Sequence, residues 1–201
     1  MAAVKTRSKA RVRASPNGHR QRPKHRKQKE LLKLDLGCGQ NKAEGFTGVD
    51  IWEGEGVDVV HDLLKFPWPF KPESVGQVHS SHFLEHVPGR LRFQFMDELH
   101  RILAEGAEAT FIVPYYASMR AVQDPTHEWP PICEASFLYF NREWRAANKL
   151  DHYPVNCDFD FSYSYNVENI WMTRNDELRS YAFRHYWNAI NDLVVVMKKR
   201  A

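Results

Sequence analysis

Residues 34–39 read Leu-Asp-Leu-Gly-Cys-Gly, an apolar strand that runs directly into a glycine-rich turn. Because glycine has no Cβ, such a turn lets a ligand approach the backbone closely. Open α/β sheets bind their ligands at this place, in the crevice outside the carboxyl ends of the strands. The stretch therefore predicts an α/β domain with a ligand site after its first strand.

The next predicted strand, residues 46–51, contains Asp50, and an acid at the end of a second strand can accept hydrogen bonds from both hydroxyls of a ribose. This arrangement favours a ligand that contains a nucleoside. The dinucleotide-binding fingerprint has a third glycine at the position of Lys42 and an acid about 20 residues further on. Asp50 comes too early for that pattern, so a dinucleotide is disfavoured.

S-adenosylmethionine (SAM) has no pyrophosphate and does not need the third glycine. We expect its amino-acid end against residues 37–39, its ribose at Asp50 and its adenine near Asp62 and Leu63. The alternative is a tight turn among ordinary surface acids. The ordered series LDLGCG, GVDI and HDL at three strand ends favours SAM over that alternative.

The chain alternates short apolar runs with helical periods, which predicts a parallel α/β sheet. Strands are expected over residues 31–36, 46–51, 57–60, 74–81, 109–113, 158–165 and 192–197. Helices are expected over residues 90–103, 134–150 and 177–187, with Gly106 as the cap that ends the first of them. Residues 40–45 are too few for the usual crossover helix, so we expect an irregular loop or one helical turn there.

From residue 31 to about residue 115 the sequence resembles the class I SAM-dependent methyltransferases, through LDLGCG, FTGVD, VVHDLLKFPWPF, VGQVHSSHFLEHV and ELHRILAEGAEATFIVP. The later segments QDPTHEWPP, FLYFNREW, LDHYP and VVVMKKR resemble a subgroup of small bacterial and phage methyltransferases whose substrates are largely unassigned. Ala107 departs from the family, which usually has a second glycine there. The resemblance implies a Rossmann-like α/β fold, with a mostly parallel seven-stranded sheet flanked by helices and an antiparallel strand near the C-terminus.

The resemblance also implies a set of cofactor contacts. The expected cofactor-binding residues are Asp35, Gly37, Cys38, Gly39, Asp50, Ile51, Asp62, Leu63, Ser80 and Ser81. In this family the methyl group of SAM points toward the loop after the fourth strand. His82 and Glu85 are therefore expected near the reacting centre.

Methyl transfer is a displacement at carbon, which needs alignment of the acceptor with the sulfonium and a base when the acceptor is a hydroxyl. His82 is one candidate for that base, and the alternative is a histidine that only hydrogen-bonds the backbone. Glu85 and His127 complete the candidate catalytic set. Substrate contacts are expected from Tyr115, Tyr116, Asp124 and Trp129, around and after the end of the fifth strand. A packed aromatic lid without substrate contact is the alternative for these aromatic side chains.

His82, Glu85 and His86 also spell H-x-x-E-H, the signature of one class of zinc peptidases. That chemistry needs the motif within a helix and a further carboxylate from a second helix. Here His82 follows directly on a predicted strand, and residues 88–89, Pro-Gly, soon break any helix. We therefore expect no metal.

The acceptor is not named by any motif. Neither the [DNS]-P-P-[YF] motif of amino-methylating nucleic-acid enzymes nor the Pro-Cys of cytosine-C5 enzymes follows the fourth strand. This favours a hydroxyl of a small molecule or glycan as the methyl acceptor. The alternatives are an RNA or DNA methyltransferase that uses its N-terminal tail, and a non-catalytic module of the same fold that binds a partner through that tail.

The charge of the chain is divided unevenly. Residues 1–29 hold eleven Lys or Arg and no acid, whereas the other residues carry 17 Lys or Arg against 25 Asp or Glu, a formal charge of −8. We expect a disordered basic tail that binds phosphates or is simply solvated, followed by a single domain over residues 30–201.

The cysteine pattern and the hydropathy predict a compartment. Three widely spaced cysteines, no apolar run long enough for a membrane span and no signal peptide together predict a cytoplasmic protein that does not enter a membrane.

Overall fold

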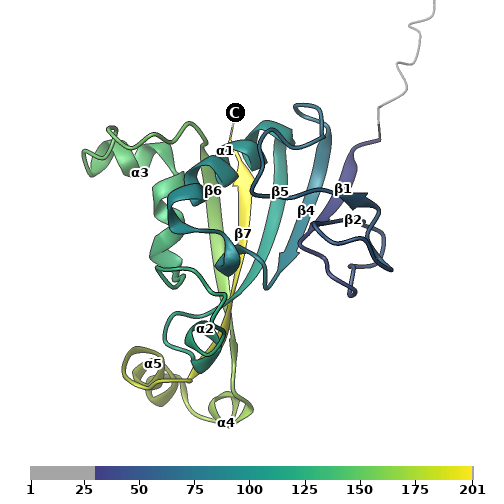
Figure 1. Ribbon diagram of the computed structural model, residues 1–201. Helices are drawn as coiled ribbons and strands as arrows, with labels where there is room; N and C mark the ends of the chain where they lie inside the picture. Colours follow the sequence, from purple (N-terminus) through teal and green to yellow (C-terminus); the bar gives the residue numbers. More distant parts are fainter. Residues whose placement is uncertain (1–29, 201) are drawn as a thin grey trace, which may run out of the picture.

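The computed structural model describes residues 30–200, so the predicted basic tail, residues 1–29, lies outside the described residues. Seven strands form one sheet in the order β3-β2-β1-β4-β5-β7-β6 (Figure 1). They are β1 (Leu32–Leu36), β2 (Thr47–Asp50), β3 (Val59–Val60), β4 (Val75–Ser81), β5 (Leu103–Pro114), β6 (Phe159–Val167) and β7 (Ile190–Lys199). All pairings are parallel except those of β7 with β5 and β6, which confirms the predicted sheet.

The helices are short. They are the 3-10 helices η1 (Leu84–His86), η2 (Gly89–Leu91) and η3 (Glu134–Phe140), and the α-helices α1 (Arg92–Ile102), α2 (Met119–Val122), α3 (Arg142–Ala147), α4 (Asn169–Met172) and α5 (Asp176–His185). Within residues 30–200, none of these helices is long and apolar enough to cross a membrane.

Two helix predictions were wrong in detail. Residues 134–150 do not form one helix, because Asn141 ends η3 and its side chain accepts a hydrogen bond from Trp144 N, which starts α3 as a new helix. Gly106 does not cap α1: the helix ends at Ile102, and Gly106 lies inside β5 with a φ of 70°. The register of β4 against β5 shifts next to this point, so the glycine serves an irregularity of the strand.

The connections between the first strands contain no helix. Residues 37–46 join β1 to β2, and residues 51–58 join β2 to β3, although parallel strands normally need a crossover of a dozen or more residues. Side-chain carboxylates fasten these loops instead. Asp35 Oδ2 accepts from Ala43 N at 2.7 Å, and Asp58 Oδ2 accepts from Gly48 N at 2.7 Å. The irregular loop predicted over residues 40–45 is confirmed.

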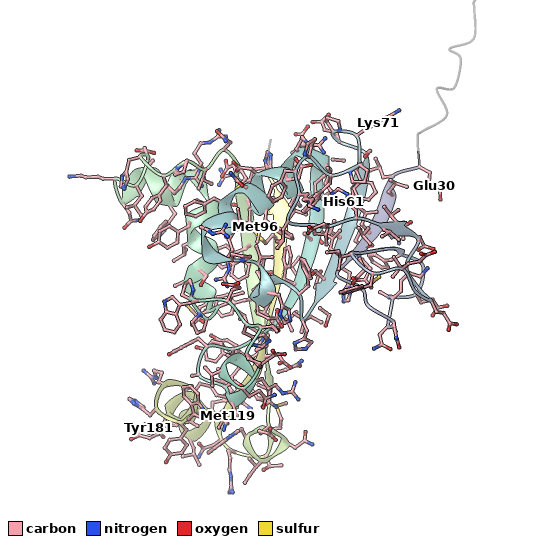
Figure 2. The ribbon with its side chains drawn as sticks, in the orientation of Figure 1. Glu30, His61, Lys71, Met96, Met119 and Tyr181 are labelled. Atoms are coloured by element: carbon pink, nitrogen blue, oxygen red, sulfur yellow. The ribbon has the colours of Figure 1, made fainter. Side chains whose placement is uncertain are left out.

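In the described chain, α1 and α5 pack on the same face of the sheet. On this face, α1 packs Phe95 against Phe111 of β5, and α5 packs Phe183 against Tyr165 of β6. In Figure 2, Met96 of α1 lies over the sheet, whereas Met119 of α2 lies beyond the carboxyl ends of the strands. On the opposite face an exposed polar row crosses five neighbouring strands: Lys33, Gln77, Glu108, Lys198 and Asp160. The alternation of charges along this row suits a face that meets water.

A buried carboxylate pins the connection between β3 and β4, residues 61–74, to α1. Glu98 accepts a hydrogen bond from Trp68 N at 2.6 Å and is paired with the Arg101 guanidinium. Trp68 in turn donates through Nε1 to Leu63 O at 3.1 Å, and its ring packs edge-on against Phe95. These bonds let an irregular segment cover the core where a crossover helix would otherwise lie.

The Glu98 pairing should make stability depend on pH. Burial alone would raise the pKa of Glu98, but Arg101 and the Trp68 N–H outweigh it and hold the pKa below its usual range. The pairing therefore contributes its full stability above about pH 4.3, the ordinary pKa of Glu, and loses it as the pH falls through the lower folded-state pKa. Urea unfolding from pH 6 to pH 3 should show a flatter decline for Glu98→Gln than for the wild type. The exposed Glu105 provides the control, because Glu105→Gln should leave the slope unchanged.

Candidate active site

The glycine turn lies at the carboxyl end of β1, against the end of β2. Gly37 and Gly39 have φ values of 68° and 50°, a region that favours glycine. Gly37 N donates to Val49 O at 2.8 Å, and Gly39 N donates to Asp50 Oδ2 at 2.9 Å. The turn and the acid that follows it in the predicted series are thus held together by a direct hydrogen bond.

The two glycines differ in their surroundings. A Cβ on Gly37 would lie 2.3 Å from the ring of Phe83 and 2.6 Å from its Cβ, whereas a Cβ on Gly39 would meet nothing within 4 Å. Phe83 comes from the segment after β4, so Gly37 is needed for the close approach of that segment to the turn. Gly39 is needed only for its backbone conformation.

A cavity of about 130 Å³ opens beside the turn at the ends of β2 and β3. Four residues of the predicted cofactor set line it, namely Asp50, Ile51, Asp62 and Leu63. His61, labelled in Figure 2, Leu64, Phe83 and His86 complete the lining. The structure therefore brings together the predicted ribose and adenine residues in one place.

Both acids of this cavity are held by backbone N–H groups. Asp50 Oδ1 accepts from Ile51 N at 2.7 Å, in addition to the bond that its Oδ2 accepts from Gly39 N. Asp62 Oδ1 accepts from Leu64 N at 3.0 Å. Each carboxylate offers about four acceptor positions, so both retain capacity toward the cavity.

The other predicted cofactor residues lie in the scaffold around the turn. Asp35 is buried, and its Oδ1 accepts from His79 Nδ1 at 2.8 Å. The Ser80 hydroxyl donates to Leu36 O at 2.9 Å and joins β4 to β1. Cys38 is buried, which raises the pKa of its thiol, and Ser81 is half-buried at the end of β4. Contact of these four with a cofactor stays a prediction.

A second cavity, of about 350 Å³, lies where β4 and β5 end. Its lining consists of His82, Glu85, His86, Pro114, Arg120, Gln123, Asp124 and His127. It contains the whole predicted catalytic set together with Asp124 from the predicted substrate set. His86 lines both cavities, so the two adjoin at this side chain.

His82 leads the chain from β4 into this cavity with an unusual backbone. Its φ is 55°, which is rare for a residue with a side chain, and its N donates to Ile112 O at 2.8 Å. Such local strain is found preferentially at functional sites. His82 Nδ1 lies 3.3 Å from Glu85 Oε1, and the nearby carboxylate raises the pKa of His82. The contact is an ion pair by distance but lacks the alignment of a hydrogen bond.

The loop after β5 contacts the loop after β4. Glu128 N donates to Glu85 O at 2.8 Å. The Arg92 guanidinium clamps both segments by donating to Val87 O on one side and to Pro130 O and Glu128 O on the other. The backbone beside His127 is therefore fixed relative to the backbone at Glu85.

The predicted aromatic contacts do not gather at this cavity. Tyr115 is buried, which raises the pKa of its hydroxyl, and it packs edge-on against Tyr116 and Tyr165. Tyr116 and Trp129 are exposed. Among the described residues that line the two cavities, none of the three predicted aromatic residues is present. Their role in substrate binding stays a prediction.

Four residues of the second cavity were not in the predicted set: His86, Pro114, Arg120 and Gln123. His86 had a signal, since it is the last letter of H-x-x-E-H. Arg120 and Gln123 had none, because their place depends on how residues 115–128 fold. Arg120 is balanced by Asp192 at 3.2 Å, so it does not present an unpaired positive charge.

A third cavity, of about 300 Å³, lies between α1 and η3 and is mainly apolar. Phe93, Met96 and Phe137 are among its lining residues, and Arg92 is its one charged residue in the described chain. Its described lining holds no acid or histidine that could move a proton.

Comparison with solved structures identifies the fold. A SAM-dependent methyltransferase from Archaeoglobus fulgidus matches with a TM-score of 0.58 and 20% sequence identity, over 85% of this chain and 87% of that one. The complex between the Haloferax volcanii Trm112 methyltransferase activator and a methyltransferase gives a TM-score of 0.50 and 14% identity, over 85% of this chain and 83% of that one. The described chain has the fold of SAM-dependent methyltransferases. No protein-family model matches the sequence, and no match was found among curated proteins.

The glycine turn of this methyltransferase fold can be tested with a matched pair of variants. Gly37→Ala and Gly39→Ala should both lose about 1–2 kcal/mol of unfolding free energy, because alanine is strained at positive φ. Gly37→Ala should lose about 1–3 kcal/mol more, since its methyl group overlaps Phe83. Equilibrium urea unfolding measures the difference, and equal losses for both variants would contradict the close approach of Phe83.

Proposed function

We propose that the protein is a SAM-dependent methyltransferase that transfers a methyl group to a hydroxyl oxygen of a small molecule or glycan. One observation carries the proposal. The glycine turn, the cavity with Asp50 and Asp62, and the cavity with His82 and Glu85 all adjoin at the carboxyl edge of a sheet with the methyltransferase strand order.

The first cavity suits the nucleoside part of SAM. Asp50 is held at its wall by the Gly39, Ile51 and Trp52 N–H groups, and the remaining lone pair on Oδ2 would accept a hydrogen bond from a ribose hydroxyl. Leu63 and Leu64 supply apolar surface for the adenine ring. The amino-acid end would extend toward residues 37–39, where the backbone can be approached closely.

The second cavity suits an acceptor with a hydroxyl group. The methyl group passes from the sulfonium to the acceptor oxygen, the sulfur keeps the electron pair of the broken bond, and the hydroxyl proton must leave. His82 and His127 both face this cavity and are the candidates to take that proton. Glu85, 3.3 Å from His82 Nδ1, would stabilise the imidazolium that forms.

The composition of the second cavity also supports oxygen as the acceptor atom. Its described lining is rich in polar side chains, namely His, Glu, Asp, Gln and Arg, and contains no Phe, Tyr or Trp. This agrees with the absence of the nucleobase motifs after β4. A polyhydroxylated acceptor would find several hydrogen-bonding partners there.

Cofactor binding is the first test. The wild type should bind SAM with a dissociation constant on the order of 1–100 µM, measured by calorimetric titration. Asp50→Ala should weaken binding at least about tenfold, because the ribose hydroxyls lose their acceptor. Glu53→Ala is the matched control, since it removes an exposed carboxylate from the same loop. Wild-type protein that binds no SAM would refute the proposal.

Methyl transfer itself is tested by radiolabelled SAM with cell extract separated into nucleic-acid, protein, glycan and small-molecule fractions. Label in the glycan or small-molecule fraction supports the proposed acceptor class. Label confined to the nucleic-acid or protein fraction would contradict it, and no label in any fraction would favour a non-catalytic module of this fold.

A nucleic-acid acceptor is the second candidate, favoured by the eleven basic residues and no acid within residues 1–29. If the tail delivers RNA or DNA, its deletion should weaken nucleic-acid binding, and binding by the full chain should fall steeply with salt through counterion release. Electrophoretic mobility-shift titrations at about 50 and 200 mM salt measure both effects. Equal binding with and without the tail would exclude this role.

A further inference from the structure

We propose that Glu85, His86 and His127 bind a divalent transition-metal ion of the Zn²⁺ class. One ligand atom from each of these side chains lies within 4.8 Å of the other two. Two imidazoles and one carboxylate form a ligand set that Zn²⁺ uses in catalytic sites, where further coordination positions stay open. The three residues line the second cavity, so those open positions would face it.

Glu85 supplies the independent observation that points to a cation. The side chain is 7% exposed, and neither carboxylate oxygen has a hydrogen-bond partner among the described residues. The nearest positive group is His82 Nδ1, 3.3 Å from Oε1 but not aligned for a hydrogen bond. A buried carboxylate without partners is strongly disfavoured, and a bound cation would satisfy it.

The two histidines are oriented as metal ligands usually are. His127 Nδ1 donates to Ala121 O at 3.2 Å, and His86 Nδ1 donates to Thr126 O at 3.3 Å. Thr126 Oγ1 lies 3.1 Å from the same His86 nitrogen and donates to Asp124. A proton on Nδ1 leaves the Nε2 lone pair of each ring available for a metal, and backbone carbonyls are common partners of metal-binding imidazoles.

The segments that carry the ligands are already fixed to each other. The backbone bond from Glu128 N to Glu85 O joins them beside the cluster, and the Arg92 clamp closes their other side. The His86 and His127 rings meet edge-on with centroids 4.8 Å apart. Ligand atoms of a tetrahedral zinc site lie roughly 3.4 Å apart, so side-chain rotations without a backbone rearrangement would complete the site.

The residue types also select among metals. Imidazole nitrogen favours Zn²⁺ and its transition-metal neighbours, whereas Mg²⁺ and Ca²⁺ prefer oxygen ligands. The sequence predicted no metal, because the H-x-x-E-H motif was not expected to lie within an α-helix. In the structure, residues 84–86 form only a short 3-10 helix. In the motif, His82 and His86 would be the two histidine ligands. In the structure, the histidine that lies with His86 and Glu85 is His127, from the loop after β5.

A bound metal ion would also take part in the proposed methyl transfer. This catalytic role rests on the proposed function, whereas the binding of the metal does not. An ion in an open site can hold a hydroxyl oxygen and lower its pKa. With His127 engaged as a ligand, His82 is the histidine left to receive the acceptor proton. The site would then favour acceptors with a hydroxyl that can approach a metal.

The test is a titration of the chelator-treated full chain with Zn²⁺, by calorimetry and by elemental analysis after dialysis. We expect one tightly bound Zn²⁺ per chain that a large excess of Mg²⁺ does not displace. Glu85→Gln and His127→Ala should each weaken this binding at least about tenfold. His152→Ala, which removes an exposed histidine far along the chain, should bind as the wild type does.

Two further measurements separate a lost ligand from a lost fold. Zn²⁺ should raise the melting temperature of the wild type and of His152→Ala but not that of Glu85→Gln. Bound Co²⁺ should give a visible absorption band that Glu85→Gln and His127→Ala alter. The proposal is overturned if no Zn²⁺ remains after dialysis, or if both ligand variants retain wild-type affinity. SAM binding, titrated without metal, tests the proposed function separately and should persist in both variants.

Discussion

Short connections between parallel strands are the constraint on which the rest of this structure depends. Residues 37–46 and 51–58 return the chain to the start of the next strand without a helix, so their backbone groups must find partners elsewhere. Carboxylates meet part of this need: Asp35 and Asp50 accept hydrogen bonds from backbone N–H groups of these loops, and Asp58 in the second loop accepts one from Gly48 N of β2. Asp35 and Asp50, which the sequence predicts as cofactor contacts, also hold these loops in place through hydrogen bonds. Fold and site therefore depend on the same side chains.

The strands and the first cavity could be predicted because their signals are local. An apolar run followed by Gly37 identifies a strand end, and the carboxyl ends of parallel strands meet at one edge whatever the details of the loops. Helix 134–150 was mispredicted because apolar periodicity says nothing about the cap that Asn141 provides for a new helix. Gly106 was mispredicted because a glycine after a helix is read equally well as a cap or as an irregular strand position.

The second cavity shows where sequence reasoning stops. His82 and Glu85 both line this cavity, and their place in the sequence shortly after a predicted strand indicated this edge of the sheet. The approach of His127 to Glu85 depends on tertiary contacts, above all on Arg92, which reaches three backbone carbonyls in two segments. No pattern in the sequence marks that arginine. Short-range motifs thus indicated residues near the strand ends, whereas the approach of the two loops to each other depends on a long-range contact of Arg92.

The order of the strands has a consequence for the synthesis of the chain. The strands β1, β2 and β3 pair across short stretches of sequence, so the cofactor side involves contacts that can form early and quickly. The second cavity, which His82 and Glu85 line, is completed only when β7 has been synthesised. Pro114 pairs with Asp192, and Arg120 binds the same acid, so a wall of this cavity is held by a residue that is synthesised long after β1, β2 and β3. During its own translation the protein completes the two halves of its site at different times.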